Sequence, residues 1–162
     1  MKNLLLIRHA KTELKGSNDK ERKLAGYGYD ECKIMSERLE TIGFMPDLIM
    51  VSSAIRAIQT ANTLAKQLDL AIEKIEVLDN LYLASYEIIL NEIANTNNRI
   101  NSLAIVGHNP GMTDLFNSIG NAPVMDIPTC GMGLFIFKTN DWIDISTEKG
   151  NLDWYSWPGK EN

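Results

Sequence analysis

The chain has 162 residues, of which 44 % are hydrophobic and 23 % charged, an ordinary composition for a folded globular protein. This length is enough to bury one sizeable core, so we expect a single domain over residues 1–162. The 16 basic and 21 acidic residues leave a net charge of −5. Because an acidic chain lacks the basic surface that a nucleic-acid backbone attracts, we expect no nucleic-acid partner.

The N-terminal sequence argues against export and membrane insertion. Its first apolar run, Leu4 to Ile7, has four residues before Arg8. A signal peptide needs about 7–15 apolar residues and a membrane span about 20. We therefore expect a cytoplasmic protein with no membrane partner.

The cysteine and histidine counts limit redox and metal chemistry. The two cysteines, Cys32 and Cys130, form no CxxC pair and are expected to be free thiols. Two histidines cannot form a three-histidine metal site. A site of two histidines and one carboxylate stays open by count, although no HExxH-like spacing supports it. We predict no metal and no other cofactor.

Short apolar runs alternate with amphipathic stretches along the chain. Residues 3–7 lack polar alternation, which is typical of a strand buried on both faces. Residues 54–69 carry apolar side chains at spacings of three and four, which predicts a helix. The expected strands are 3–7, 47–51, 73–78 at a sheet margin, 102–106 and 132–137. The expected helices are about 28–42, 54–69, 86–96 and 111–119.

This alternation predicts an α/β fold in which a mostly parallel central sheet lies between two helical layers, a three-layer α/β/α architecture. The longest candidate loop is the polar segment from Gly16 to Gly28, and the aromatic-rich tail from Trp142 onward predicts one or two late strands. In such a sheet, ligands bind beyond the carboxyl ends of the strands. Functional residues are therefore expected at those ends.

Both histidines directly follow predicted buried strands. Arg8 and His9 come after the first strand, and His108 comes shortly after the strand 102–106. A single histidine after a strand is more often a structural, hydrogen-bonded residue. Two histidines at equivalent strand ends favour a shared site instead.

Arg56 and the turn Gly107-His108-Asn109-Pro110-Gly111 point to an anion. With Ser53 as the expected N-cap, Arg56 occupies the third helical position, where the helix dipole disfavours a cation by about 0.3–1 kcal/mol. A bound anion would reverse that cost; the alternative is a solvated surface arginine. Pro110 near a helix start leaves backbone N–H groups to face an anion. Two guanidinium groups and two imidazoles would then form an oxyanion pocket suited to phosphate.

A second phosphatase-like pattern runs from Cys32 to Arg38, which satisfies the C-x5-R spacing of cysteine-dependent phosphatases. The phosphate cradle of those enzymes lies at a strand end and needs glycines and small residues. Here the five intervening residues lie in a predicted amphipathic helix and include no glycine. We interpret the match as a coincidence.

The motifs at the strand ends also occur in a known arrangement. Its elements are Arg8-His9 after an N-terminal strand, Arg56 in Ser-Ser-x-x-Arg-Ala-x-Gln-Thr-Ala at 52–61, and a late Gly107-His108. Together they resemble the histidine phosphatase superfamily, which has the phosphoglycerate mutase-like fold. The short length, Asp19-x-x-Arg22-x-Leu24 and His108-Asn109-Pro110-Gly111 resemble its small branch, the phosphohistidine phosphatases of the SixA type. The resemblance covers nearly the whole chain.

The resemblance implies a covalent mechanism without a metal. His9 would attack phosphorus as a neutral imidazole and become a phosphohistidine that water hydrolyses. Cationic neighbours would lower the pKa of His9 and favour that neutral form. Arg8, Arg56 and His108 would bind the non-bridging oxygens and stabilise the transition state.

The same resemblance suggests substrate-binding residues around this centre. Arg22 could reach into the pocket from the long loop, and Asp19 could orient it, although both could equally belong to a solvated charge run. Ser53 and Asn109, at the two helix starts, are further substrate-binding candidates.

The general acid is where this sequence departs from the family. Asp79 is the nearest carboxylate in the segment Val77 to Tyr82 that should hold it, with Glu76 as another option, but an ordinary turn aspartate also fits. Without an acid, good leaving groups such as phosphohistidine would be preferred.

We therefore expect a phosphatase of phosphohistidine or other phosphoprotein substrates. One alternative is a phosphatase of small phosphate esters, such as sugar or nucleotide-derived phosphates. Another is a non-catalytic phosphate-binding module.

Overall fold

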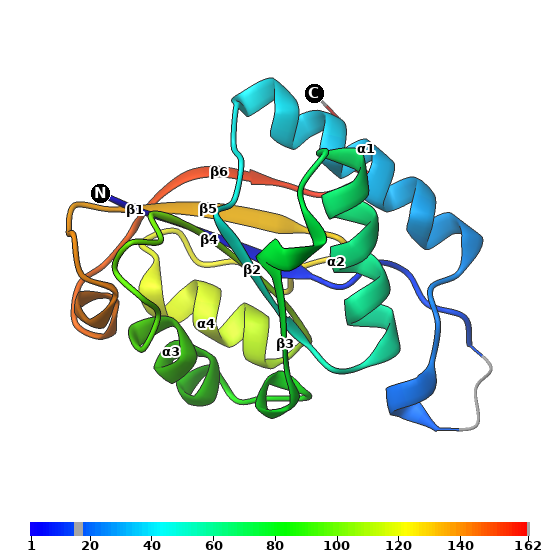
Figure 1. Cartoon of the computed structure of the whole chain (residues 1–162), viewed down its shortest axis with the longest axis horizontal. Helices are drawn as coiled ribbons and strands as arrows, with labels where there is room; N and C mark the ends of the chain where they lie inside the picture. The colour runs from blue at the N-terminus through cyan, green and yellow to red at the C-terminus, as the bar shows by residue number, and fades with distance from the viewer. Residues whose placement is uncertain (15–17, 162) are drawn as a thin grey trace.

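A six-stranded mixed sheet forms the centre of the protein, as seen in a computed structural model that describes residues 1–14 and 18–161 (Figure 1). The strand order is β3-β2-β4-β1-β5-β6. Neighbouring pairs among β1, β2, β3 and β4 are parallel, whereas β5 is antiparallel to both of its neighbours. The strands are β1 (Lys2–Arg8), β2 (Leu48–Ser52), β3 (Ile75–Leu78), β4 (Ser102–Gly107), β5 (Met132–Phe137) and β6 (Asn151–Ser156).

Two pairs of helices cover the two faces of this sheet (Figure 1). Helices α1 (Gly26–Ile42) and α2 (Ile55–Gln67) pack on one face, and α3 (Tyr86–Ala94) and α4 (Gly111–Ile119) pack on the other. Short 3-10 helices span Asp19–Glu21, Ile72–Lys74, Asp79–Leu81 and Trp142–Ser146. The predicted three-layer architecture with a mostly parallel sheet is therefore confirmed.

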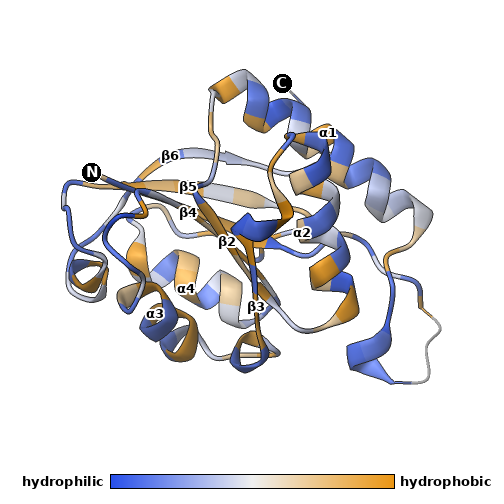
Figure 2. Ribbon diagram, viewed as in Figure 1, coloured by the Kyte–Doolittle hydropathy of each residue, from blue (hydrophilic) through white to orange (hydrophobic). Residues whose placement is uncertain are grey.

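The central strands are apolar along their length because both of their faces are buried. In β1, Leu5 and Ile7 join the core beneath α1 and α2, whereas Leu4 and Leu6 join the core beneath α3 and α4. Figure 2 shows hydrophobic residues concentrated in the central strands and mixed colouring along the helices. This explains why β1 shows no polar alternation in the sequence.

Most predicted elements lie within two residues of their observed bounds. Strand β5 and helix α4 match the predictions residue for residue, while α1 begins at Gly26, two residues early. The expected strand 73–78 is split, because Ile72–Lys74 forms a 3-10 helix before β3 begins at Ile75. The tail forms one strand, β6. Residues 16 and 17 of the expected loop from Gly16 to Gly28 lie outside the described part of the chain.

The predicted N-cap of α2 is wrong. Ala54 rather than Ser53 occupies that position, and no side chain within residues 1–14 and 18–161 caps the helix by a hydrogen bond. Arg56 is consequently the second helical residue instead of the third. The Ala54 N–H donates to the hydroxyl oxygen of Ser52, two residues earlier in the chain, at 3.2 Å.

Candidate active site

The carboxyl ends of three adjacent strands converge on one pocket. Strands β2, β4 and β1 are neighbours in the sheet, and Arg8 at the end of β1 lies opposite Gly107 at the end of β4. A cavity of about 370 Å³ opens at this edge. Its walls are formed by Arg8, His9, Lys11, Thr12, Leu14, Asp19, Arg22, Arg56, Leu83, His108, Asn109 and Thr129.

The His9 side chain is buried and held in one orientation. Its Nδ1 lies 2.9 Å from the Ala10 carbonyl oxygen, so Nδ1 carries the ring hydrogen and donates it. The Ala10 N–H donates to Thr60 Oγ1 at 3.0 Å, and the Thr60 hydroxyl donates to the Arg56 carbonyl at 2.8 Å. These bonds leave Nε2 of His9 with a lone pair, 3.4 Å from Nε of Arg56.

The pKa of His9 is lowered to about 4, mainly by burial; the charges of Arg56, Arg8 and Arg22 add to this lowering, and the hydrogen bond to the Ala10 carbonyl opposes it. The imidazole is therefore neutral at pH 7. The Nε2 lone pair accepts only a long hydrogen bond, from Nε of Arg56 at 3.4 Å, and a neutral ring in this state can act as a nucleophile.

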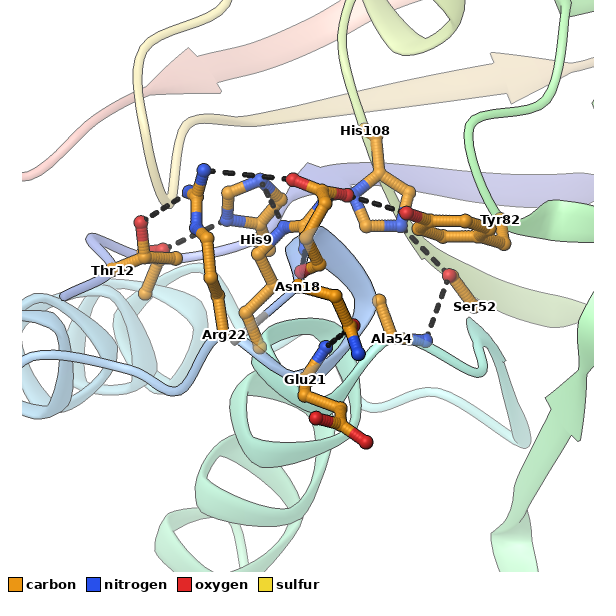
Figure 3. A network of polar contacts seen from close by, with 12 residues as sticks. His9, Thr12, Asn18, Glu21, Arg22, Ser52, Ala54, Tyr82 and His108 are labelled. Carbon is orange, nitrogen blue, oxygen red and sulfur yellow. Dashed lines mark hydrogen bonds and ion pairs between the residues drawn. The ribbon is translucent and has the colours of Figure 1, made fainter. Parts of the chain in front are cut away.

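His108 faces His9 across the pocket, with a ring-centroid separation of 5.2 Å (Figure 3). Its Nε2 lies 2.7 Å from the Ser52 hydroxyl oxygen. Because that oxygen already accepts the Ala54 N–H, its own hydrogen is free to be donated to Nε2. Nδ1 of His108 then carries the ring hydrogen, and it has no hydrogen-bond partner in the described part of the chain.

Burial, followed by the proximity of His9 and Arg56, lowers the pKa of His108 to about 3. The ring is therefore a neutral hydrogen-bond donor at pH 7. A buried donor without a partner carries a free-energy cost that an anion in the pocket would remove.

Arg56 is buried at the start of α2, with only 3 % of its surface exposed. Its Nη1 donates to the Asp19 carbonyl at 2.6 Å, and its Nη2 donates to Asp19 Oδ2 at 3.0 Å. Hydrogen bonding from Tyr82 and from Arg56 holds the pKa of Asp19 below its usual value. The Asp19 carboxylate is therefore charged and balances a cation that the helix dipole would otherwise disfavour.

Two more guanidinium groups complete the cationic lining. Arg22 donates from Nη2 to Thr12 Oγ1 at 2.6 Å and lies 3.5 Å from the Asp19 carboxylate (Figure 3). Arg8 donates from Nη1 to the Ile127 carbonyl at 2.8 Å. The Nε groups of Arg8 and Arg22 are buried and have no hydrogen-bond partner among the described residues.

The structure thus brings seven of the nine predicted site residues to one cavity. They are Arg8, His9, Asp19, Arg22, Arg56, His108 and Asn109. Their proposed chemical roles remain predictions. The Asn109 side chain is already engaged within the protein, because its Nδ2 donates to Asp126 and to the Ile127 carbonyl and its Oδ1 accepts from Thr113.

Ser53 and Asp79 do not line this cavity. The Asp79 side chain is 88 % exposed and lies 3.6 Å from Nζ of Lys20. Hydrogen bonding from Ser53 and the charge of Lys20 lower the pKa of Asp79, so its carboxyl is ionised at neutral pH. An outward-facing ionised carboxylate is poorly placed to protonate a leaving group. The geometry therefore does not favour Asp79 as a general acid.

Sequence reasoning missed Tyr82. Its hydroxyl donates to Asp19 Oδ2 at 2.5 Å, and its ring meets the His108 ring edge-on with centroids 5.7 Å apart (Figure 3). Tyr82 therefore connects the loop that carries Asp19 to the opposite wall of the pocket. The only signal in the sequence was its place in the segment 77–82 that should hold the acid.

Glu31 of α1 was also missed, although it is buried beneath the site. Its Oε1 accepts the Lys11 N–H at 2.6 Å and its Oε2 accepts the Thr129 hydroxyl at 2.9 Å. Burial raises the pKa of this carboxyl. Glu31 therefore joins two loops that line the cavity. The sequence signal that could have identified it is its position in the apolar stripe of α1, in line with Met35 and Leu39.

This fold, with an imidazole nucleophile candidate among guanidinium groups at the strand ends, defines an α/β phosphatase. The family model described as the histidine phosphatase superfamily (branch 1) matches residues 4–113. The chain belongs to that superfamily.

Comparison with known proteins extends the likeness over almost the whole chain. A SixA structure from Nakamurella multipartitia superimposes with a TM-score of 0.86 at 18 % identity, covering 98 % of this chain and 97 % of that chain. The protein histidine phosphatase SixA complexed with tungstate gives 0.82 at 22 % identity, covering 96 % and 97 %. An uncharacterized chloroplastic protein of Arabidopsis thaliana is 22 % identical over 94 % of this chain and 74 % of its own length.

Two further features of the described residues concern membranes and metal ions. No helix there is long and apolar enough to cross a membrane. In the same residues, no cluster of three or more histidine, cysteine, aspartate or glutamate side chains is arranged to hold a metal ion.

Proposed function

We propose that this phosphatase removes phosphoryl groups from phosphohistidine or other phosphorylated residues of proteins, through a phosphohistidine intermediate on His9. The observation that carries the proposal is the state of the His9 ring. It is neutral, oriented by the Ala10 carbonyl, and presents its Nε2 lone pair to a cationic cavity. That combination suits in-line attack on phosphorus.

The proposed reaction has two displacement steps. In the first, the Nε2 lone pair of His9 forms a bond to phosphorus while the bond from phosphorus to the leaving group breaks, and the leaving group takes a proton from solvent. In the second, water attacks the phosphoryl group on His9, releases inorganic phosphate and a proton, and regenerates the neutral imidazole.

The cationic lining would stabilise charge on the phosphoryl oxygens in both steps. Arg8, Arg22 and Arg56 supply guanidinium groups, which match oxyanions in charge and geometry. His108 would donate its unpartnered Nδ1–H to a third oxygen. These groups are oriented before the substrate arrives, which is the arrangement that lowers a barrier most effectively.

The state of the pocket carboxylate favours phosphohistidine as the substrate. Asp19 is ionised and bonded to Arg56 and Tyr82, so it is not a ready proton donor. The alcohol part of a phosphate ester leaves as an unfavourable alkoxide unless an acid protonates its oxygen. The ring of a phosphohistidine can be protonated from solvent, because the pKa of a free imidazole is about 6.5. The likeness to SixA structures supports the same substrate class.

Small phosphate esters are the second candidate substrates. A cavity of about 370 Å³ is large enough for the phosphate and part of the body of a metabolite. Rates of phosphate release from a phosphohistidine protein and from a panel of sugar and nucleotide phosphates would separate the two candidates.

The intermediate can be tested by trapping, because the chain has only two histidines. After rapid quenching with radiolabelled substrate, the wild type should carry an acid-labile label that His9→Asn abolishes. His108→Asn is the matched control and should retain a labelled His9 at a lower rate of formation. Labelling or full turnover by His9→Asn would overturn the proposed nucleophile.

A further inference from the structure

A second hollow lies directly beside the catalytic cavity. It has a volume of about 590 Å³ and is lined by Lys11, Thr12, Glu13, Leu14, Ala25 and Tyr27. Lys11, Thr12 and Leu14 also line the catalytic cavity. Because the two hollows share this wall, a group bound in the second would lie next to a phosphoryl group bound at His9.

The hollow has a floor built from paired backbone. Thr12 forms an antiparallel bridge with Leu24, and the Glu13 N–H donates to the Lys23 carbonyl at 3.0 Å. The Ala25 N–H donates to the Lys11 carbonyl at 3.0 Å. These bonds join the segment after His9 to the start of α1, so the shape of the hollow is set by the same loop that positions the nucleophile.

The walls of this hollow are apolar and exposed. Leu14 is 94 % exposed and Tyr27 is 65 % exposed, and Ala25 also lines the hollow. A leucine and an aromatic ring facing solvent beside an active site are typical of a surface that another molecule covers. The charged groups of Lys11 and Glu13 belong to its polar rim.

We propose that this hollow is a subsite for an apolar side chain that flanks the phosphorylated residue of a protein substrate. The inference rests on the proposed function and adds a specificity determinant to it. A polypeptide fits because neighbouring residues are about 3.8 Å apart along the chain, so residues close to a phosphohistidine seated at His9 reach across the shared wall. A sugar phosphate covered in hydroxyl groups would gain nothing by contact with Leu14 and Tyr27.

The test uses synthetic phosphohistidine peptides in a glycine and serine background. A single phenylalanine is placed in turn at each of three positions on either side of the phosphohistidine. We expect phenylalanine at one or two of these positions to raise kcat/KM by about tenfold, which corresponds to burial of part of an aromatic side chain. The gain should appear mainly in KM, since the subsite does not touch the reacting atoms.

Variants of Tyr27 connect that preference to the hollow. Tyr27→Ser should remove most of the phenylalanine preference and Tyr27→Phe should keep it. Both should hydrolyse the phosphohistidine peptide with only glycine and serine around it, which has no apolar side chain for the hollow, at the wild-type rate. Tyr29→Ser is the matched control, because Tyr29 lies on the same helix and lines a different surface hollow. It should retain the preference.

Two failures are distinguishable. If the wild type hydrolyses all peptides equally, or if Tyr27→Ser keeps the full preference, the subsite is overturned while the proposed function stands. If p-nitrophenyl phosphate is hydrolysed but no phosphohistidine peptide is, the proposed substrate class and the subsite that rests on it are both overturned.

Discussion

At the scale of single residues, the site consists of cations that are neutralised or oriented by partners. Asp19 is the central example, because its carbonyl and carboxylate both accept from Arg56. Tyr82 in turn donates to Asp19 and places its ring against His108. The chain of contacts runs from Tyr82, directly after the 3-10 helix Asp79–Leu81, through Asp19 to Arg56 at the start of α2, so Tyr82 is a positioning residue and not a catalytic one.

Tyr82→Phe tests this positioning role. Loss of a hydrogen bond to a charged carboxylate costs about 1.5–3 kcal/mol in buried sites; since Tyr82 is partly exposed, we expect kcat/KM to fall by a smaller factor, about three- to tenfold. The pKa of Asp19 should rise, because the Tyr82 hydrogen bond is the main cause of its depression. NMR titration of the carboxyl would measure that rise.

The control for Tyr82→Phe is Tyr29→Phe, which removes an exposed hydroxyl from another surface. In a double-mutant cycle, the losses of kcat/KM caused by Tyr82→Phe and Asp19→Asn should be strongly non-additive, because both substitutions disrupt the same Tyr82–Asp19 hydrogen bond. Additive losses would contradict the proposed coupling.

At the scale of elements, the approach of α1 to the nucleophile loop depends on a glycine. A Cβ at Gly28 would lie 2.2 Å from the Lys11 carbonyl oxygen, a distance that real structures do not tolerate. The same carbonyl accepts the Ala25 N–H at the helix start. Helix α1 can therefore pack closely against the loop after His9 only because Gly28 has no side chain.

Gly28→Ala should force α1 and the Lys11 loop apart. We expect a loss of about 1–3 kcal/mol in the free energy of unfolding, measured by urea denaturation, together with a lower kcat. Gly26→Ala is the matched control, because a Cβ there meets nothing within 4 Å, and its stability should be unchanged or slightly higher. Equal effects of the two substitutions would contradict this account of the packing.

At the scale of the whole molecule, burial of both histidines makes stability depend on pH. The pKa values of His9 and His108 lie at about 4 and about 3 in the folded protein, below the ordinary value of 6.5. The unfolded chain therefore binds more protons than the folded one as the pH falls below 6.5, and stability decreases. Well above pH 6.5 the rings are neutral in both states and the effect vanishes.

The free energy of unfolding should consequently fall by about 2–3 kcal/mol between pH 6.5 and pH 5, with the two histidines contributing jointly. Urea denaturation at a series of pH values would measure it. In the double variant His9→Asn/His108→Asn the dependence over this window should largely disappear. A wild-type curve that is flat from pH 6.5 to pH 5 would show that the histidines titrate normally.

Much of the fold and the centre of the candidate site could be predicted from the sequence. The apolar run of β5 and the periodic face of α4 give their bounds to the residue, because burial of a strand or helix leaves a regular pattern. Arg8, His9 and His108 could be placed together because parallel strands end at one edge of the sheet. These inferences depend on periodicity and topology, both of which are local or regular.

The sequence says less where no periodicity exists. Ser53 is not the N-cap of α2. Asp79 is exposed beside Lys20 and does not line the cavity, and its role as general acid stays a prediction. Tyr82 and Glu31 contact the site through bonds that span 63 residues to Asp19 and 20 residues to Lys11. The direction of such side chains depends on the loop backbone and on partners distant in sequence. Contacts of this kind leave no regular pattern in the amino-acid sequence.

The sequence by itself therefore determined the alternation of strands and helices and the convergence of the basic and imidazole side chains at one sheet edge. Hydrophobic burial enforces both. Only the tertiary structure decided which carboxylate enters the pocket, which ring nitrogen of His9 keeps its lone pair, and where an apolar hollow opens beside it. Those features follow from individual hydrogen bonds between loops, whose geometry exists only once the sheet and its helices have packed.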